Sequence, residues 1–432
     1  MDTAARPAAP GQPNIVLVLA DDLGVGDLGT YGARLIRTPT IDRLAATGVV
    51  CESMYAAGAT DTPSRAGLLT GRFGARYGLP ASLRPGMTAG LPSGVPTMAS
   101  LLRSAGYRTA WFGQWRLGSL GEQHPLHHGF DTFAGTLFGT DVDPLTWYQG
   151  TTATDPAFDI AFGARRITDE AIRFVDEHRH EPFLIVLSHL APHAPYAPEP
   201  AFAGRSRAGA YGDVVEQLDS HLGRLIDHLH RTRLSANTLV VITSDNGPGG
   251  EGRTQSRRGR KPEVYDGGVR VPFVASQLTQ TRRIRDTVPR SLLDVTPSLC
   301  ALAGVPAPDD LDGEDMSALL TGRASPTRGP VYLFFNEFLN AVRHEQWKLH
   351  VAFDNDRRPP GNRPWSYVPQ LFDVDTDPRE TYNLAALHPD VVEVLRDGLE
   401  ATRQDVAAEA ASQSAPERST HPSPVEVEEV LR

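Results

Sequence analysis

Three continuous apolar runs rich in β-branched residues constrain the fold of this 432-residue chain more than any other feature. They cover residues 15–20 (IVLVLA), 183–187 (FLIVL) and 239–243 (LVVIT). A strand without polar alternation is typical of a parallel sheet that is buried on both faces. Helical patterns separate these runs, at residues 39–47, 98–105, 161–178 and 212–231. The alternation predicts an α/β fold with a doubly wound sheet covered by helices on both faces.

The pattern changes beyond about residue 329, where short strands are expected at 330–335, 347–351 and 370–374, followed by a helix at 389–402. A chain of this length can hold a large core and an accessory domain. We therefore expect a loose leader at 1–13, a main domain at 14–328 and a small C-terminal α+β domain at 329–403. Residues 404–432 are rich in Ala, Ser, Pro and Glu, which predicts a mobile tail.

Charge and apolar run length exclude several classes of protein. The net charge of -10 does not suit a nucleic-acid coat, although a local basic pocket for a small anion remains possible. Two cysteines, Cys51 and Cys300, do not make a disulfide framework. No apolar stretch approaches the roughly 20 residues that span a bilayer, and no secretory signal is visible. We expect a cytoplasmic protein without nucleic-acid or membrane partners. The sequence does not indicate an oligomeric state.

Two polar clusters follow the first and third apolar runs directly. Asp21 and Asp22 end the first run, and Asp245, Asn246 and Gly247 follow the third. Ligands bind at the carboxyl edge of parallel strands, so both clusters are expected at one site. Three carboxylates and an amide oxygen favour Ca²⁺ or Mg²⁺, and also permit Mn²⁺. The alternative is that both clusters are ordinary turns and helix caps.

Three further candidates lie elsewhere in the chain. In TDTPSR, Pro63 and Ser64 suit the first turn of a helix, so Asp61 is either an N-cap or an anion at the positive helix end. His193, in LAPHAPY, and Lys261, in RRGRKPEVYDGG, flank expected sheet edges, although each also fits a structural or solvated role. HLAPH is not a zinc motif, because its proline breaks helical spacing and no cysteine is near.

The order of these motifs resembles the sulfatase family of the alkaline-phosphatase superfamily. The series runs DD, xPSRxxLLTGR, GxWxLG, PHxP, SDNG and GxKxxxYxGGVRVP. Further landmarks are TPTIDRLAATGV, LLRSAGYRTAWFG, HHGFD, DVTPSLCALAGVP, WKL and LFDVDTDPRETYNL. The resemblance covers roughly residues 14–400. It implies a large doubly wound α/β domain with a small C-terminal domain built on an antiparallel sheet, and an enzyme of the sulfuric-ester hydrolase kind.

The resemblance also implies roles for single residues. Asp21, Asp22, Asp245 and Asn246 match the family's calcium or magnesium ligands. Arg65 matches the arginine that steadies the nucleophile. His193 and Lys261 match the residues that bind the sulfate ester and its leaving oxygen.

Three positions depart from the family pattern. Family members carry Cys, or sometimes Ser, two residues before the proline of xPSR and oxidise it to formylglycine; this chain has Asp61 there. Gln114 replaces the lysine, and Arg116 replaces the histidine, of the GKWHLG segment. Cys51 lacks the PSR context and is rejected as a substitute. No formylglycine is therefore expected, and the joint change indicates a repurposed or decayed site.

Asp61 can act as a further metal ligand, a general base or a covalent nucleophile. We favour metal ligand or base over nucleophile, and rank the Thr60 and Thr62 hydroxyls lower because each is one residue out of register. The favoured function is a metal-dependent enzyme for a small sulfate or phosphate ester. One alternative is a non-hydrolytic lyase, cyclase or group transferase of specialised metabolism. The other is an inactive homologue that binds an anion.

Overall fold

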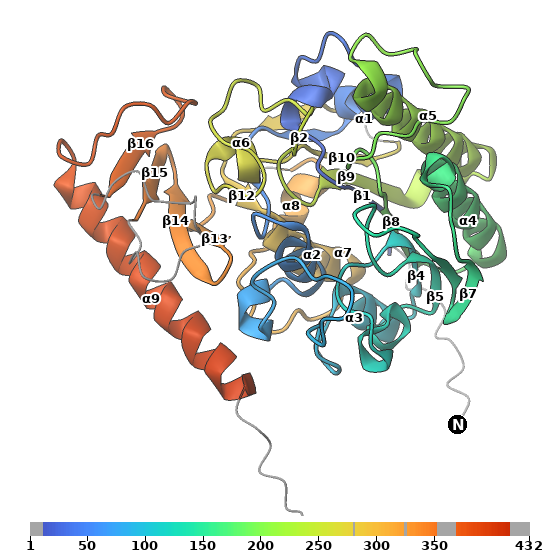
Figure 1. Cartoon of the computed structure of the whole chain (residues 1–432), viewed down its shortest axis with the longest axis horizontal. Coiled ribbons are helices and arrows are strands. Elements are labelled where there is room, and N and C mark those ends of the chain that lie inside the picture. The colour runs from blue at the N-terminus through green and yellow to red at the C-terminus, as the bar shows by residue number, and fades with distance from the viewer. Residues whose placement is uncertain (1–11, 280, 324–325, 352–368, 415–432) are drawn as a thin grey trace, which may run out of the picture.

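A computed structural model describes residues 12–279, 281–323, 326–351 and 369–414. Among these residues, ten strands form one large sheet, and a separate four-stranded sheet lies toward the C-terminus (Figure 1). The expected α/β fold with a small C-terminal antiparallel sheet is confirmed. No helix in the described ranges is long and apolar enough to cross a membrane.

The centre of the large sheet is parallel, in the order β9, β1, β8, β4, β5, and antiparallel strands extend both sides. In spatial order the strands are β11 (Ile284–Asp286), β2 (Val49–Cys51), β10 (Phe273–Gln277), β9 (Thr238–Ser244), β1 (Asn14–Ala20), β8 (Phe183–Ser188), β4 (Arg108–Gln114), β5 (Thr132–Thr136), β6 (Trp147–Gln149) and β7 (Thr152–Asp155). All three apolar runs of the sequence are therefore adjacent central strands, as the lack of polar alternation predicts.

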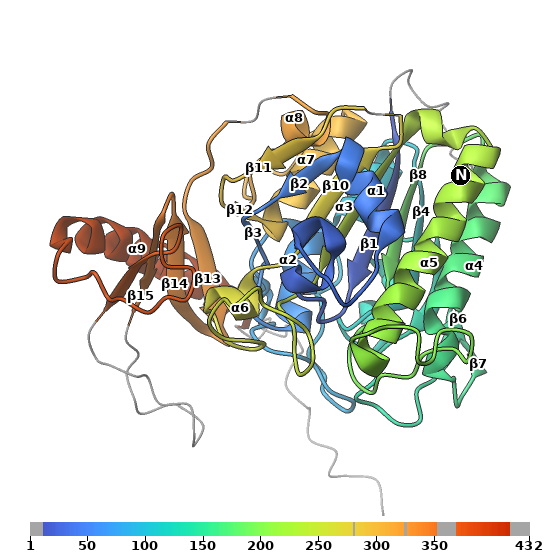
Figure 2. The same ribbon diagram turned by 90° about the horizontal axis from the view of Figure 1, so that it is seen from above.

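Helices cover both faces of this sheet (Figure 2). Alternate side chains of β1 belong to two different hydrophobic cores, one on each face of the sheet. The helices on one face are α1 (Pro39–Thr47), α4 (Gly163–His178) and α5 (Gly209–Arg231). Those on the other face are α2 (Asp61–Thr70), α3 (Met98–Ser104), α7 (Val295–Ala303) and α8 (Ser317–Leu320). The four helices expected in this part of the chain all form, within a few residues of the expected bounds.

Short elements complete the main domain. Two of them pair, β3 (Met54–Tyr55) with β12 (Arg290–Ser291), and the one-turn helix α6 (Asp266–Val269) follows the segment that carries Lys261. The 3-10 helices are η1 (Val25–Asp27), η2 (Gly29–Tyr31), η3 (Gly74–Tyr77), η4 (Gly121–Gln123), η5 (Pro125–His127), η6 (Ile160–Phe162), η7 (Leu234–Asn237) and η8 (Leu292–Asp294).

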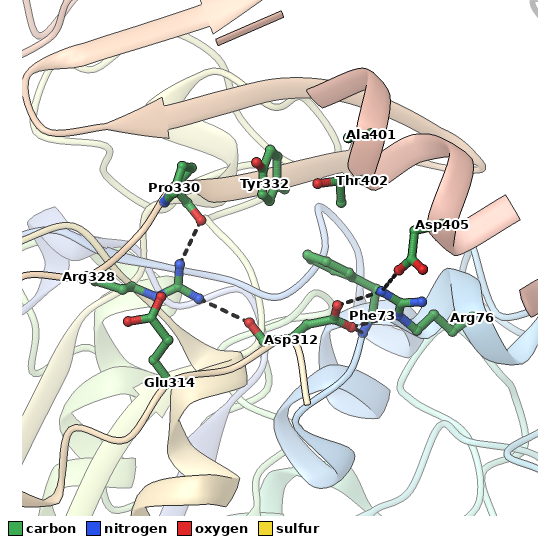
Figure 3. Close-up of a pocket in the computed structure, with 10 residues that line it drawn as sticks. All are labelled: Phe73, Arg76, Asp312, Glu314, Arg328, Pro330, Tyr332, Ala401, Thr402 and Asp405. Carbon is green, nitrogen blue, oxygen red and sulfur yellow. Dashed lines mark hydrogen bonds and ion pairs between the residues drawn. The ribbon is translucent and has the colours of Figure 1, made fainter. Parts of the chain in front are cut away.

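The C-terminal domain is an antiparallel sheet of β13 (Val331–Phe335), β14 (Phe338–His344), β15 (Trp347–His350) and β16 (Gln370–Asp373), with the long helix α9 (Pro389–Ser414) packed on it. The expected start of a mobile tail at residue 404 was wrong, because α9 continues to Ser414. Val406 is buried there, and Asp405 pairs with Arg76 on η3 (Figure 3). Glu409 pairs with the same arginine. Most of the leader and residues 415–432 lie outside the described residues.

Candidate functional site

The two polar clusters meet because β1 and β9 are parallel and in register. Ala20 pairs with Ser244, so the next residues of each strand, Asp21 and Asp245, emerge side by side at the carboxyl edge. The Asp22 amide donates to Asp245 Oδ1 at 3.3 Å, and Asn246 Nδ2 donates to Asp22 Oδ1 at 2.7 Å. Asp22 takes a left-handed backbone, with φ of 66°, which turns the chain at the strand end.

This cluster fits a divalent cation. Oxygens of Asp21, Asp22 and Asp245 lie within 4.8 Å of one another, and all three residues are buried. Asp21 Oδ1 and Asn246 Oδ1 are buried without a hydrogen-bond partner, although most buried polar atoms have one. Burial raises the pKa of Asp22 and, despite the opposing charge of Arg65, raises that of Asp245 to about 7. Carboxylates crowded in this way favour a positive charge, and their oxygen-only donor set suits Ca²⁺ or Mg²⁺.

Arg65 already compensates one of these carboxylates. It lies on α2 and is fully buried, with Nε and Nη2 at 2.9 and 2.8 Å from Asp245 Oδ2. Its Nη1 donates to Ser188 Oγ at 2.6 Å. Arg65 therefore contacts the metal-side carboxylate, as the resemblance implies, and its hydrogen bonds fix the guanidinium in place.

Asp61 is the first residue of α2, and Thr60 is the N-cap, so the plain N-cap interpretation of Asp61 was wrong. Its carboxylate accepts a hydrogen bond from Lys261 Nζ and lies 3.5 Å from Arg116 Nη1, and Ser82 Oγ donates to it at 3.3 Å. Burial raises the pKa of Asp61, but the charges of Lys261 and Arg116 outweigh burial and hold the pKa below its usual range.

These contacts affect which of the roles considered for Asp61 are supported. Asp61 faces cations, and the group of mutually close carboxylates consists of Asp21, Asp22 and Asp245. The favoured metal-ligand interpretation therefore has no support from its contacts, and the lowered pKa weakens the general-base interpretation. The Thr62 hydroxyl is committed to backbone groups, because it donates to Arg116 O at 2.8 Å and accepts from Leu83 N at 3.0 Å.

Of the two altered positions, Gln114 is the last residue of β4 and Arg116 lies two residues beyond it. Gln114 donates Nε2 to Asp21 Oδ2 at 2.6 Å, so it orients a metal-side carboxylate and adds no charge. Arg116 has φ of 63° and lies in a space that Gly139 leaves open, since a Cβ at that glycine would clash with the guanidinium. Asp141 holds the guanidinium from the other side, at 2.7 and 3.2 Å.

Lys261 and His193 complete the site. Lys261 Nζ donates to Asp22 Oδ1 at 2.7 Å, so it bridges Asp22 and Asp61. His193 Nδ1 lies 2.6 Å from Ala194 O and 2.9 Å from Thr140 Oγ1, and Nε2 lies 3.9 Å from Asp22 Oδ2. Burial lowers the pKa of His193, but the charges of Asp21 and Asp22 outweigh burial and raise it.

All the site residues that the sequence indicates thus lie in one place, namely Asp21, Asp22, Asp61, Arg65, Gln114, Arg116, His193, Asp245, Asn246 and Lys261. Three supporting residues were missed: Ser82, Thr140 and Asp141. The only signal for the last two was their place in the segment that joins β5 to β6, at residues 137–146.

A cavity of about 240 Å³ opens beside Asp22 and His193. Tyr196 and Tyr211 line it with their rings 5.3 Å apart in an edge-to-face arrangement. Its remaining wall is a glycine-rich turn at residues 249–252, whose carbonyls accept hydrogen bonds from Arg260 Nη1 at 2.7–2.9 Å. The site therefore offers room for more than an anion.

Comparisons with known proteins find similar sequences over most of the chain. A family described as Sulfatase matches residues 13–305, and one described as C-terminal region of aryl-sulfatase matches residues 326–426. Steryl-sulfatase of Homo sapiens is 32% identical, covering 91% of this chain and 88% of that protein. Arylsulfatase A of Homo sapiens is 34% identical, covering 91% and 88%. N-acetylgalactosamine-6-O-sulfatase of Bacteroides thetaiotaomicron is 30% identical, covering 91% and 93%.

Solved structures are similar over the same range. A structure from work on glycosaminoglycan metabolism by Bacteroides thetaiotaomicron has a TM-score of 0.81 and 28% identity, covering 91% of this chain and 100% of that one. The PsFucS1 sulfatase from Pseudoalteromonas sp. has a TM-score of 0.81 and 25% identity, covering 92% and 91%.

Proposed function

The chain belongs to the sulfatase family, and from that premise we propose that it is a divalent-metal-dependent hydrolase of sulfate esters that works without formylglycine. The observation that carries the proposal is the position of Asp61. Its carboxylate stands at the start of α2, between Lys261 and Arg116 and next to the buried carboxylate cluster. By the resemblance to the family, this carboxylate would stand where the formylglycine is expected.

The metal would be held by Asp21, Asp22, Asp245 and Asn246, whose free oxygens and mutual distances support this assignment. When bound, it would supply positive charge for the oxygens of the ester. The charges support such an ion: with all groups ionised, the five carboxylates exceed the three cations Arg65, Arg116 and Lys261 by two negative charges. The carboxylates are those of Asp21, Asp22, Asp61, Asp141 and Asp245.

The residues of the chain would divide the remaining work. Lys261 and Arg116 would bind the ester anion through the nitrogens that now contact Asp61. His193 would protonate the leaving oxygen from Nε2, since Thr140 and Ala194 engage its other nitrogen. The cavity beside Tyr196 would receive the organic group.

Two roles of Asp61 balance chemically. As a base, it accepts a proton from water, whose oxygen attacks sulfur while the ester S–O bond breaks. As a nucleophile, its carboxylate oxygen attacks sulfur, the alcohol leaves with a proton from His193, and water cleaves the acyl sulfate to restore Asp61. After a single turnover in H₂¹⁸O, label in the Asp61 side chain identifies the nucleophile, because it requires attack of water on the acyl carbon of the intermediate.

The test of the function is turnover of aryl sulfates, phosphates and phosphonate monoesters with Ca²⁺, Mg²⁺ or Mn²⁺. Metal-dependent release of sulfate that disappears in Asp61→Ala and in Asp61→Asn supports the proposal. Release that persists in both variants removes Asp61 from the mechanism. If the natural protein hydrolyses no ester of the panel, the hydrolase assignment is overturned.

A second candidate has its own observation. Each cation of the site already has a carboxylate partner, with Arg65 on Asp245, Arg116 on Asp61 and Asp141, and Lys261 on Asp22 and Asp61. Asp61 could thus act as a resident anion in a protein that binds, or transforms without hydrolysis, a ligand able to displace it. Metal-dependent ligand binding without release of sulfate or phosphate would favour this candidate.

A further inference from the structure

A cluster of buried charges joins the C-terminal domain to the segment that carries Lys261. We propose that Glu380 and Lys348 are positioning residues for that active-site lysine, so that docking of the C-terminal domain sets the anion-binding geometry. The inference rests on the proposed function for the role of Lys261. The structural part of the inference, that Glu380 and Lys348 hold the segment around Lys261 in place, does not depend on the proposed function.

Asp266 is the main-domain side of this link. It is the first residue of α6, and its buried carboxylate accepts hydrogen bonds from Lys348 Nζ at 2.8 Å and Arg270 Nη1 at 2.9 Å. The Tyr55 hydroxyl donates to it at 3.1 Å. Lys348 comes from β15, in the other domain, and is fully buried. The start of α6 is thereby tied directly to the C-terminal sheet.

Glu380 holds the same segment at two points. Its Oε2 accepts from the Asp266 amide at 2.7 Å, and its backbone carbonyl accepts from Arg258 Nη1 at 2.9 Å. Its Oε1 lies 3.0 Å from Lys348 Nζ and 2.8 Å from His350 Nε2. Lys261 lies between the two anchored points, Arg258 and Asp266, so both ends of its segment depend on one residue of the C-terminal domain.

The segment has little room to move independently of α6. The Gly267 amide donates to Arg258 O at 2.7 Å, and a Cβ on Gly268 would lie 2.6 Å from Arg260 O. On its far side, Gly268 O accepts from the Gly247 amide at 2.9 Å, directly after Asn246. Backbone packed on backbone transmits a displacement of α6 to Lys261 and to the turn that holds Asn246.

The energetics favour a specific role over a general stabilising one. Taking Asp266, Lys348 and Glu380 out of water carries a large desolvation cost, and an apolar cluster could replace such ions without loss of stability. Glu380 also holds a left-handed backbone with φ of 50°, which a residue other than glycine seldom takes. Three landmarks of the sequence meet here, namely YDGGVRVP, WKL and DTDPRETYNL, and no residue of this cluster touches the substrate site.

The experiment compares Glu380→Gln with Asp405→Asn in the full-length protein. Asp405 also pairs across the two domains, but with Arg76 on η3, away from the lysine segment (Figure 3). In Glu380→Gln, hydrogen–deuterium exchange in residues 257–270 should accelerate about tenfold, since the Asp266 amide and Lys348 lose a charged acceptor while Arg258 keeps the Glu380 carbonyl. For a substrate that the natural protein turns over, KM should rise about tenfold with kcat nearly unchanged, because Lys261 binds the anion in ground and transition states alike.

Arg258→Ala provides a second variant, because Arg258 is only half-buried and its loss severs the link from the loop side. It should show the same changes with smaller amplitude, and it decides the matter if Glu380→Gln does not fold. Unchanged exchange in residues 257–270, or equal acceleration in Asp405→Asn, overturns the inference. If the natural protein turns over no ester, the proposed function fails while the exchange data still decide whether Glu380 holds the segment.

Discussion

The Asp61 carboxylate accepts a hydrogen bond from the Lys261 ammonium inside a largely buried pocket. An external anion must therefore compete with Asp61 for Lys261, or bind with Asp61 still in place. Removal of the carboxylate takes one anionic partner from each of Lys261 and Arg116, and leaves Lys261 on Asp22 and Arg116 on Asp141.

Asp61→Ala should consequently bind inorganic sulfate more tightly than the natural protein, by about tenfold or more. In the variant, sulfate no longer has to displace the Asp61 carboxylate to form charge-assisted hydrogen bonds with Lys261 and Arg116. Calorimetric titration of both proteins at equal metal concentration measures the change. Asp141→Ala is the matched control, because it removes an outer partner of Arg116 but leaves Asp61 on Lys261. Equal or weaker sulfate binding by Asp61→Ala would mean that Lys261 and Arg116 do not form the anion site.

Gly139→Ala should disturb the guanidinium of Arg116, because the added Cβ would clash with it. We expect kcat/KM to fall about tenfold or more, the scale of effect when a substrate-binding group is displaced by a fraction of an ångström. Gly121→Ala is the control, since nothing lies within 4 Å of its Cβ position. Equal kcat/KM values for the two variants would show that turnover does not depend on the position of the Arg116 guanidinium.

Metal binding should stabilise the fold, because the site gathers buried carboxylates that the unfolded chain disperses. Saturation at a hundredfold excess over Kd contributes about 2.7 kcal/mol, which corresponds to a rise of about 3 °C in Tm for a chain of 432 residues. Differential scanning calorimetry with and without chelator measures the rise for Ca²⁺, Mg²⁺ and Mn²⁺. Asn246→Ala should reduce the response, and a Tm that no ion shifts would contradict the assigned ligands.

The sequence predicts well which residues of the site lie at the ends of parallel strands. It predicts poorly the contacts that loops make with them. Asp21 and Asp245 follow apolar runs, so the rules of parallel sheets are enough to bring them together. The hold of Asp141 on Arg116, and of Glu380 on Asp266, joins loops whose mutual position follows from tertiary packing. No periodicity marks such partners. Likewise, the composition around Asp405 resembles a tail, and only its pairing with Arg76 across the domains indicates an ordered helix.

His128 should make the protein sensitive to acid. It is buried, with its ring stacked at 5.7 Å from that of Trp115, and burial lowers its pKa to about 4 from 6.5. Between these values the unfolded chain binds a proton that the native protein excludes, so stability falls as the pH drops from 6.5 to 4, by about 3 kcal/mol in full. His128→Phe keeps the ring and should flatten the pH dependence of the urea midpoint, whereas exposed His230→Phe should not. Parallel curves for His128→Phe and the natural protein would contradict this.

Arg76 should be the main polar link between α9 and the main domain. It is buried in η3, and its guanidinium contacts Asp312 and Asp405, each at 2.7 Å (Figure 3). It also contacts Glu409 at 2.8 Å. Arg76→Ala leaves these carboxylates facing one another, and we expect a loss of about 2 kcal/mol, below the cost for a fully buried pair because Asp405 is largely exposed. The loss should appear first as faster proteolysis within α9. Arg403→Ala, which breaks an exposed pair with Glu400 on the same helix, should leave the cleavage rate unchanged. Equal cleavage of the two variants would show that Arg76 is not needed to hold α9 in place, since Arg72 also pairs with Glu409.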